Sequence, residues 1–156
     1  MGNLINKVVT MDTTELDHKL TNVPRFIGAF PFDDLPAKPT TDFSVIINTD
    51  SKNGPGEHWL ALVRKKTVFY FHDSYGRLPD DDLFTIDFKK VMKNYINGKC
   101  VSNTKWIQQI TSNVCGDHSV YFINEMETKK FSDILSVFTS NLKDNDELVL
   151  EYVKQL

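Results

Sequence analysis

The chain has 156 residues and a formal net charge of −3, with 40% hydrophobic and 25% charged residues. This length fits one domain, because domains most often have about 100 to 150 residues, so we expect a single domain over residues 1–156. The composition is that of a packed globular protein and excludes intrinsic disorder and collagen-like repeats. Its apolar stretches are no longer than a strand, so the sequence predicts a soluble protein without a membrane span.

The net charge and the number of cysteines indicate which classes of partner and which cellular compartment to expect. The net negative charge does not favour nucleic acid as a partner, although the basic cluster Arg64–Lys66 keeps that class open. Two cysteines are too few for a disulfide framework, and the first residues lack the apolar stretch of a signal peptide. We therefore expect an intracellular protein with free thiols, in the cytoplasm or the nucleus.

The first half of the chain predicts one short helix and then a group of strands. Thr13 or Thr14 can cap the helix. Residues 24–39 hold four of the six prolines and are interpreted as a packed loop. The predicted strands are Phe43–Asn48, His58–Arg64 and Thr67–His72. A short polar connection between the last two suits a β-hairpin.

The second half of the chain is mainly helical. Asp87 can cap a helix that runs to residue 96, and a strand is predicted over Val101–Ile110. Three more helices are predicted to begin near Cys115, Ser132 and Asp144. Because strands and helices are largely segregated along the chain, the order indicates an α+β fold.

Cys115 is the first residue with a chemical interpretation. It precedes Gly116 at the predicted start of a helix, where unpaired backbone N–H groups and the positive end of the helix dipole lower a thiol's pKa. Such a thiolate is a nucleophile, and Gly116 would let a substrate backbone approach closely. The alternative is a small buried apolar residue, the commonest role of a cysteine in a helix.

His58 and Asp73 flank the predicted hairpin, one at its first strand and one just after its second. If the strands pair, both residues lie at one end of the sheet. A thiol nucleophile needs an imidazole to accept its proton, and the imidazole needs a carboxylate to orient it. The alternatives are a surface histidine and an aspartate of the turn that Gly76 closes.

Gln109 lies six residues before Cys115. Its side-chain amide could donate to the oxyanion of a tetrahedral intermediate, an interaction worth about 3 to 4 kcal/mol in comparable sites. The alternative is a solvated polar residue of the predicted strand. In a strand, neighbouring side chains point to opposite faces, so only one of Gln108 and Gln109 can face the site.

In combination, these elements resemble the adenovirus-type cysteine proteases and their relatives, the SUMO-specific proteases. The resemblance rests on His58-Trp59, on Asp73-Ser74-Tyr75-Gly76, on Gln109 and on Cys115-Gly116, in the family's order of His, Asp and Cys. It covers roughly residues 26–126. It implies the adenovirus type of the papain-like cysteine protease superfamily, with a central mixed or antiparallel sheet and flanking helices.

The resemblance implies a role for each matched residue. Cys115 would be the nucleophile, His58 the base, Asp73 the orienting acid and Gln109 the oxyanion donor. Trp59 and Gly116 would contact the substrate, with Trp59 lining the cleft. Some relatives carry the glutamine one position farther from the cysteine, which keeps Gln108 open. The resemblance implies neither a metal nor an organic cofactor.

The closest likeness within the family is to the maturation proteases of adenoviruses, virophages and Polinton-type elements. It is carried by the short chain and by the segments Phe26–Pro31 and Asp34–Pro36. It implies a viral thiol protease that is packaged in the virion and cleaves capsid precursors at small-residue or glycine-containing sites. It also implies the option that an activating peptide pairs with Cys100. Whether DNA is an activator stays open.

Four other interpretations remain open. The same chemistry could act on SUMO or ubiquitin-like conjugates, the same fold could be an acetyltransferase, or the chain could be an inactive capsid-binding module. A zinc site could use Cys115 and His118 with His72 or Cys100, but structural sites usually show two close ligand pairs and only one is visible. Trp106 is interpreted as a core residue.

Overall fold

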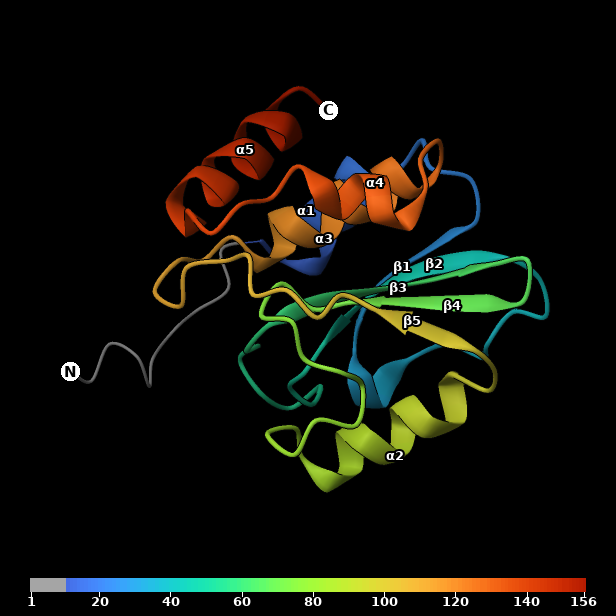
Figure 1. The fold of residues 1–156 in the computed structure, drawn as a ribbon. Coiled ribbons are helices and arrows are strands. Elements are labelled where there is room, and N and C mark those ends of the chain that lie inside the picture. The colour runs from blue at the N-terminus through green and yellow to red at the C-terminus, as the bar shows by residue number, and fades with distance from the viewer. Residues whose placement is uncertain (1–10) are drawn as a thin grey trace.

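The computed structural model of the protein describes residues 11–156, so the first ten residues of the expected domain lie outside the described part. The strands are β1 (Phe26–Pro31), β2 (Phe43–Asn48), β3 (Trp59–Lys65), β4 (Val68–His72) and β5 (Cys100–Ser102). The helices are α1 (Thr13–Lys19), the 3-10 helix η2 (Phe32–Asp34), α2 (Ile86–Tyr95), α3 (Cys115–Met126), α4 (Phe131–Ser136) and α5 (Leu142–Lys154). A five-stranded mixed sheet with flanking helices confirms the α+β class (Figure 1).

The predicted hairpin of β3 and β4 lies at the centre of the sheet. The two strands are antiparallel, with Ala61 opposite His72. The turn residues Lys66 and Thr67 have φ angles of 49° and 71°, the left-handed pair that a tight two-residue hairpin requires. The antiparallel pairing brings the residue before β3 and the residue after β4 to one end of the sheet.

The strand order across the sheet is the chain order, β1-β2-β3-β4-β5. The pair β2 and β3 is antiparallel, whereas the two outer pairs, β1 with β2 and β4 with β5, are parallel. The connection from β4 to β5 contains α2, which lies with η2 on one side of the sheet (Figure 1). On the other side lie α1, α3, α4 and α5.

The strand expected over Val101–Ile110 is wrong beyond Ser102. Directly after β5, the side chain of Asn103 donates to the carbonyls of Asp73 and Lys105 and accepts from the backbone N–H of Lys105. Such side-chain bonds offer the backbone an alternative to the sheet ladder. The chain therefore leaves the sheet and continues to α3 as an irregular segment.

Three other expectations need correction. The segment 24–39, interpreted as a loop, contains the edge strand β1, where Pro31 is tolerated at the strand's end. The cap of α2 is Thr85, whose hydroxyl accepts from the backbone N–H of Phe88, rather than Asp87. The cap of α1 is Asp12, which forms a capping box with Glu15, rather than a threonine.

Alternate residues of the central strands face two hydrophobic cores. On one face of β3, Trp59, Ala61 and Val63 pack with residues of α1, α3 and α5. On the other face, Leu60 and Leu62 pack with residues of α2. Burial on both faces fixes the register of β3, because a slip of one residue would exchange the two sets. Among the described residues, no helix combines the length and apolar character of a membrane span.

Candidate active site

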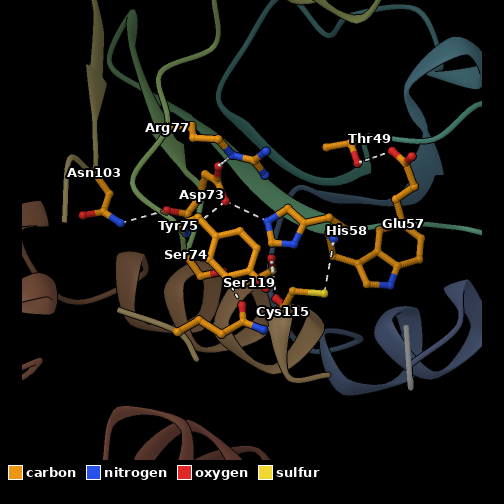
Figure 2. A network of polar contacts seen from close by, with 12 residues as sticks. Thr49, Glu57, His58, Asp73, Ser74, Tyr75, Arg77, Asn103, Cys115 and Ser119 are labelled. Atoms are coloured by element: carbon orange, nitrogen blue, oxygen red, sulfur yellow. Dashed lines mark hydrogen bonds and ion pairs between the residues drawn. The ribbon is translucent and has the colours of Figure 1, made fainter. Parts of the chain in front are cut away.

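Three segments meet at one end of the sheet. His58 immediately precedes β3, Asp73 immediately follows β4, and Cys115 is the first residue of α3. Figure 2 shows the three side chains converging, with the imidazole of His58 between the other two. The hairpin register brings His58 and Asp73 together, and the packing of α3 on β3 supplies Cys115. The structure thus brings together three of the four residues predicted to carry the chemistry.

His58 and Asp73 form a buried pair. The Nε2 atom of the imidazole lies 2.7 Å from Oδ1 of the carboxylate, and Asp73 is completely buried. The backbone on both sides is held in place: the carbonyl of His58 accepts from the N–H of Thr49, and that of Asp73 accepts from the amide of Asn103. The ring of Tyr75 stacks on the imidazole at 4.8 Å. These contacts fix the orientation of the imidazole, as a general base requires.

The sulfur of Cys115 lies on the other side of the imidazole. The buried Nδ1 atom of His58 is turned toward it (Figure 2), and the backbone N–H of Trp59 donates to the sulfur at 3.4 Å. No side chain caps the N-terminus of α3, so the first turn of this helix presents its N–H groups and dipole toward the site. The surroundings of the sulfur therefore favour a negative charge.

The electrostatics of the pair differ from those of isolated side chains. Burial alone would lower the pKa of His58, but the charges of Asp73 and Cys115 and their hydrogen bonds outweigh it and raise that pKa to about 9. Burial would likewise raise the pKa of Asp73, but His58 and Arg77 hold it well below its usual range. The charged imidazolium beside the ionised Asp73 is therefore the favoured form of His58 at neutral pH.

Of the two residues expected to contact the substrate, Gly116 lies in the core, whereas Trp59 is largely buried and also lines a cavity. Trp59 is 4% exposed, and its indole N–H donates to the backbone carbonyl of Met11. A Cβ atom at Gly116 would lie 3.3 Å from the Met11 side chain and 3.4 Å from that of Leu16. The small residue after Cys115 therefore lets α1 pack against α3, and the geometry gives it no place at a substrate backbone.

The two glutamines lie in different surroundings. The segment after β5 runs beside the turn after β4, because Ile107 N–H donates to the carbonyl of Ser74. Gln108 is fully buried there: its Oε1 accepts from the Ser74 hydroxyl at 2.5 Å, and its Nε2 donates to Ser112. Gln109 instead donates through Nε2 and its backbone N–H to Asp146. The structure thus places Gln108, not the favoured Gln109, beside the turn that carries Asp73.

A second His–Asp pair lies behind the first. Nε2 of His118, on α3, is 2.9 Å from Oδ1 of Asp146, on α5, and both residues are buried. No group of three metal-ligating side chains occurs within residues 11–156, so the structure supports no zinc site built on Cys115 and His118. The function of Asp146 is to bind His118 and the Gln109 backbone at once. No motif in the sequence indicated this role.

The sequence analysis assigned no role in the site to three residues that lie near it. Arg77 donates to Asp73, and Ser74 binds Gln108, although both lie within or beside the matched turn. Trp106 was interpreted as core, which is wrong, because it is 51% exposed and its ring lies 5.5 Å from that of Tyr75. The available signal was the turn itself, since Gly76 reverses the chain and returns the next residue toward Asp73.

A cavity of 390 Å³ lies beside Trp59. It is bounded by the residues that begin α1, by the ends of β1 and β2, and by the loop between β2 and β3. Cys115 and His58 are only 1% and 6% exposed, so there is little open space directly around the sulfur and the imidazole. Cys115 and His58 are thus closely packed, and the cavity lies beside the neighbouring residue Trp59.

No protein-family model matches the chain, and a search of curated proteins gives no significant match. The resemblance to the adenovirus-type proteases therefore rests on the sequence motifs alone.

Proposed function

We propose that the protein is a cysteine endopeptidase of adenovirus-protease type. The observation that carries the proposal is the row of Cys115, His58 and Asp73, in which the imidazole binds the carboxylate through Nε2 and faces the thiol with Nδ1. A histidine and an aspartate alone occur in many structural pairs. A thiol at a helix N-terminus on the second nitrogen of the same imidazole makes the set a nucleophile, a base and an orienting acid.

The reaction follows from these positions. The thiolate of Cys115 attacks the carbonyl carbon of the scissile peptide, and the imidazolium of His58 gives its proton to the leaving amine as the C–N bond breaks. Water then attacks the thioester, His58 accepts its proton, and the second product leaves as a carboxylic acid while Cys115 is regenerated. Asp73 keeps the imidazole oriented through both steps.

Gln108 is the side-chain oxyanion donor of this proposal, in place of the predicted Gln109. Its burial beside Ser74 and its position in the irregular segment before α3 support the assignment. The Gln109 amide is bound to the buried carboxylate of Asp146. The Gln108 amide is bound to Ser112, a contact that the oxyanion would replace. The backbone N–H of Cys115 is the second donor, since N–H groups of a first helical turn point out of the helix end.

The proposed substrates are capsid precursor proteins, cut at glycine-containing or small-residue sites during particle maturation. The substrate class comes from the family resemblance. The preference for small residues has physical support, because Cys115 and His58 are almost fully buried and a bulky side chain next to the scissile bond would clash with packed atoms. Trp59, which is buried against Met11, contributes to this wall from behind rather than as an exposed clamp.

A peptide library and an electrophilic peptide probe test the proposal. We expect cleavage beside glycine, and a glycine-ended probe should add one label, at Cys115, detected by mass spectrometry. Cys115→Ala should abolish both signals while leaving the fold intact, and Cys100→Ser is the matched control that should retain both. Cleavage by Cys115→Ala within threefold of the parent would overturn the nucleophile assignment.

The same preparation separates the alternative functions. Cleavage of a tagged SUMO or ubiquitin-like fusion, with no cleavage of capsid precursors, would point to a deconjugating protease. Acetyl transfer from acetyl-coenzyme A would point to an acetyltransferase. Binding of a capsid protein without any labelling of Cys115 would identify an inactive binding module.

A further inference from the structure

Arg77 contacts the carboxylate of Asp73 on the side away from His58. Its Nε atom lies 2.5 Å from Oδ2, whereas His58 and the backbone N–H of Tyr75 bind Oδ1 at 2.7 and 3.1 Å. The Asp73 side chain is completely buried, and that of Arg77 is 21% exposed. The guanidinium is therefore a charged partner of a desolvated carboxylate, and such contacts are stronger than exposed ion pairs.

The turn after β4 holds Arg77 in this position. The N–H of Gly76 donates to the carbonyl of Asp73 at 2.8 Å, which reverses the chain. Gly76 has a φ of 74°, and a Cβ atom there would lie 2.8 Å from the backbone of Lys105. The requirement for glycine is thus both conformational and steric. The reversal directs the next residue back to the carboxylate.

Two aromatic rings hold the guanidinium on its faces. Its central carbon lies 4.5 Å from the ring centroid of Phe84 and 5.5 Å from that of Tyr75. Tyr75 in turn stacks on His58. Arginine in such a stack keeps one orientation, because cation–π contact and the ion pair restrict the same side chain. Arg77, Tyr75, Asp73 and His58 therefore form one packed unit.

We propose that Arg77 is a positioning residue of the catalytic site: it fixes the Asp73 carboxylate against His58 and offsets part of its charge, so that the imidazolium releases its proton to a leaving amine more readily. This inference rests on the proposed function. A histidine acts best as acid and base when its affinity for the proton is near the working range. Without Arg77, the full charge of Asp73 would act on the imidazole and retain the proton.

Other titratable groups also act on His58 and Asp73. They are Cys115 and His118 on α3, His72 on β4 and Tyr75 in the turn, and Asp146 on α5 interacts with two of these, His118 and Tyr75. The thiolate of Cys115 stabilises the imidazolium, as Asp73 does. His72 stays uncharged at neutral pH, since burial lowers its pKa to about 3. Arg77 is the cation among these groups that opposes the charge of Asp73 from within hydrogen-bond distance.

The test measures the proton on His58 without any substrate. In protein carrying Cys100→Ser, so that Cys115 is the thiol that reports, NMR of labelled histidine gives the pKa of the imidazolium and iodoacetamide gives the alkylation rate of Cys115 against pH. We expect Arg77→Gln to raise the imidazolium pKa by about 0.5 to 1. The alkaline limb of the curve of alkylation rate against pH should shift to higher pH by the same amount. Arg77→Lys should restore most of the parent curve.

The matched control is Arg64→Gln, which removes an arginine at the far end of β3, where it lies near Phe69. It should leave both curves unchanged. Arg77→Gln with an unchanged imidazolium pKa, or an equal rise in the control, would overturn the inference. If Arg77→Gln does not fold, Arg77→Met decides, because it keeps the aliphatic part of the side chain and removes the charge, so the same rise of the imidazolium pKa is expected. Neither readout depends on proteolysis, so failure of the protease proposal is detected separately.

Discussion

The two buried His–Asp pairs of this protein have nearly the same hydrogen bond but opposite electrostatics. The nitrogen–oxygen distances are 2.7 Å for His58–Asp73 and 2.9 Å for His118–Asp146. The pKa of His58 is raised to about 9. That of His118 is lowered, because burial outweighs the attraction of Asp146 and the nearby His58 repels a second positive charge.

The difference lies in the other contacts of each member. The second nitrogen of His58 faces the thiol of Cys115, whereas that of His118 is buried without a hydrogen-bond partner. Asp73 binds Arg77 with its second oxygen, whereas Asp146 binds the Gln109 amide and backbone. A carboxylate on an imidazole is therefore no sign of catalysis by itself. Under the proposed function, the group that faces the second nitrogen distinguishes the two pairs: the His58 pair would be catalytic and the His118 pair structural.

Replacing each histidine by glutamine is the strongest test of this contrast. Glutamine can keep a hydrogen bond to the carboxylate but cannot accept a proton from a thiol. His58→Gln should lower kcat/KM by about 10⁴-fold or more, whereas His118→Gln should stay within a few-fold of the parent. Steady-state cleavage of the preferred peptide gives both values. A larger loss for His118→Gln would reverse the assignment of the two pairs.

Replacing the two aspartates should also lower the rate more at the first pair than at the second, but by less than replacing the histidines. Asp73→Asn should reduce kcat by about 10³-fold with little loss of stability, because the amide keeps a hydrogen bond but removes the charge that supports the imidazolium. Asp146→Asn should cost less than about tenfold in rate and about 1 to 3 kcal/mol in the free energy of unfolding. Kinetics and urea denaturation of both variants separate the two effects. Equal rate losses would contradict the contrast.

The glutamines extend the comparison to the oxyanion. Gln108→Ala should lower turnover by about 10²-fold, the effect of removing one oxyanion donor. Gln109→Ala should have a smaller effect, since it loosens the contact with Asp146 without removing a donor. Single-turnover rates on an ester and on an amide substrate measure the loss in acylation. The reverse ranking would return the oxyanion role to Gln109.

His72 gives the smallest and most specific test, because its charge interacts with both pairs. Its ring stacks on Phe122 at 4.5 Å, and both of its nitrogens are buried without a partner. An unfolded histidine gains a proton below about pH 6.5, whereas His72 in the fold does so only near pH 3, so stability falls as the pH drops below 6.5.

His72→Phe should remove the loss of stability that His72 causes at low pH. Between pH 7.5 and 5, the unfolding free energy of the variant should rise relative to that of the parent by about 2 kcal/mol. Denaturant titrations at the two pH values measure it, and His18→Gln on α1 serves as the control. Parallel pH profiles for His72→Phe and the parent would mean that folding does not change the pKa of His72, which would contradict the lowered value.

The sequence predicted those parts of the protein that depend on local pattern. The hairpin followed from two strand-like runs with a short polar connection, and the α3 start from the spacing after Cys115. Together, these two features predicted that His58, Asp73 and Cys115 form one site. Fold class followed from the order of elements, since helices and strands are segregated along the chain.

The remaining parts depend on contacts between distant residues. The surroundings of the two glutamines could not be predicted, because Asn103 ends β5 with side-chain bonds and the strand alternation assumed for Gln108 and Gln109 does not apply. Trp59 and Gly116 follow His58 and Cys115 in the sequence, but both contact Met11, just before α1, which no local pattern shows. Asp146 comes from α5, 37 residues after the Gln109 that it binds.

The agreement between strand order and chain order has a consequence for folding. Each strand joins the sheet beside its predecessor, so the sheet can grow outward from the β3–β4 hairpin by short steps, and such local contacts form quickly. Cys115 enters only when α3 docks on β3, 50 residues after Lys65. We therefore expect the amides of β3 and β4 to gain protection from hydrogen exchange during refolding before Cys115 becomes protected from rapid alkylation. A nascent chain would then hold a formed sheet before Cys115 is brought to His58 and Asp73.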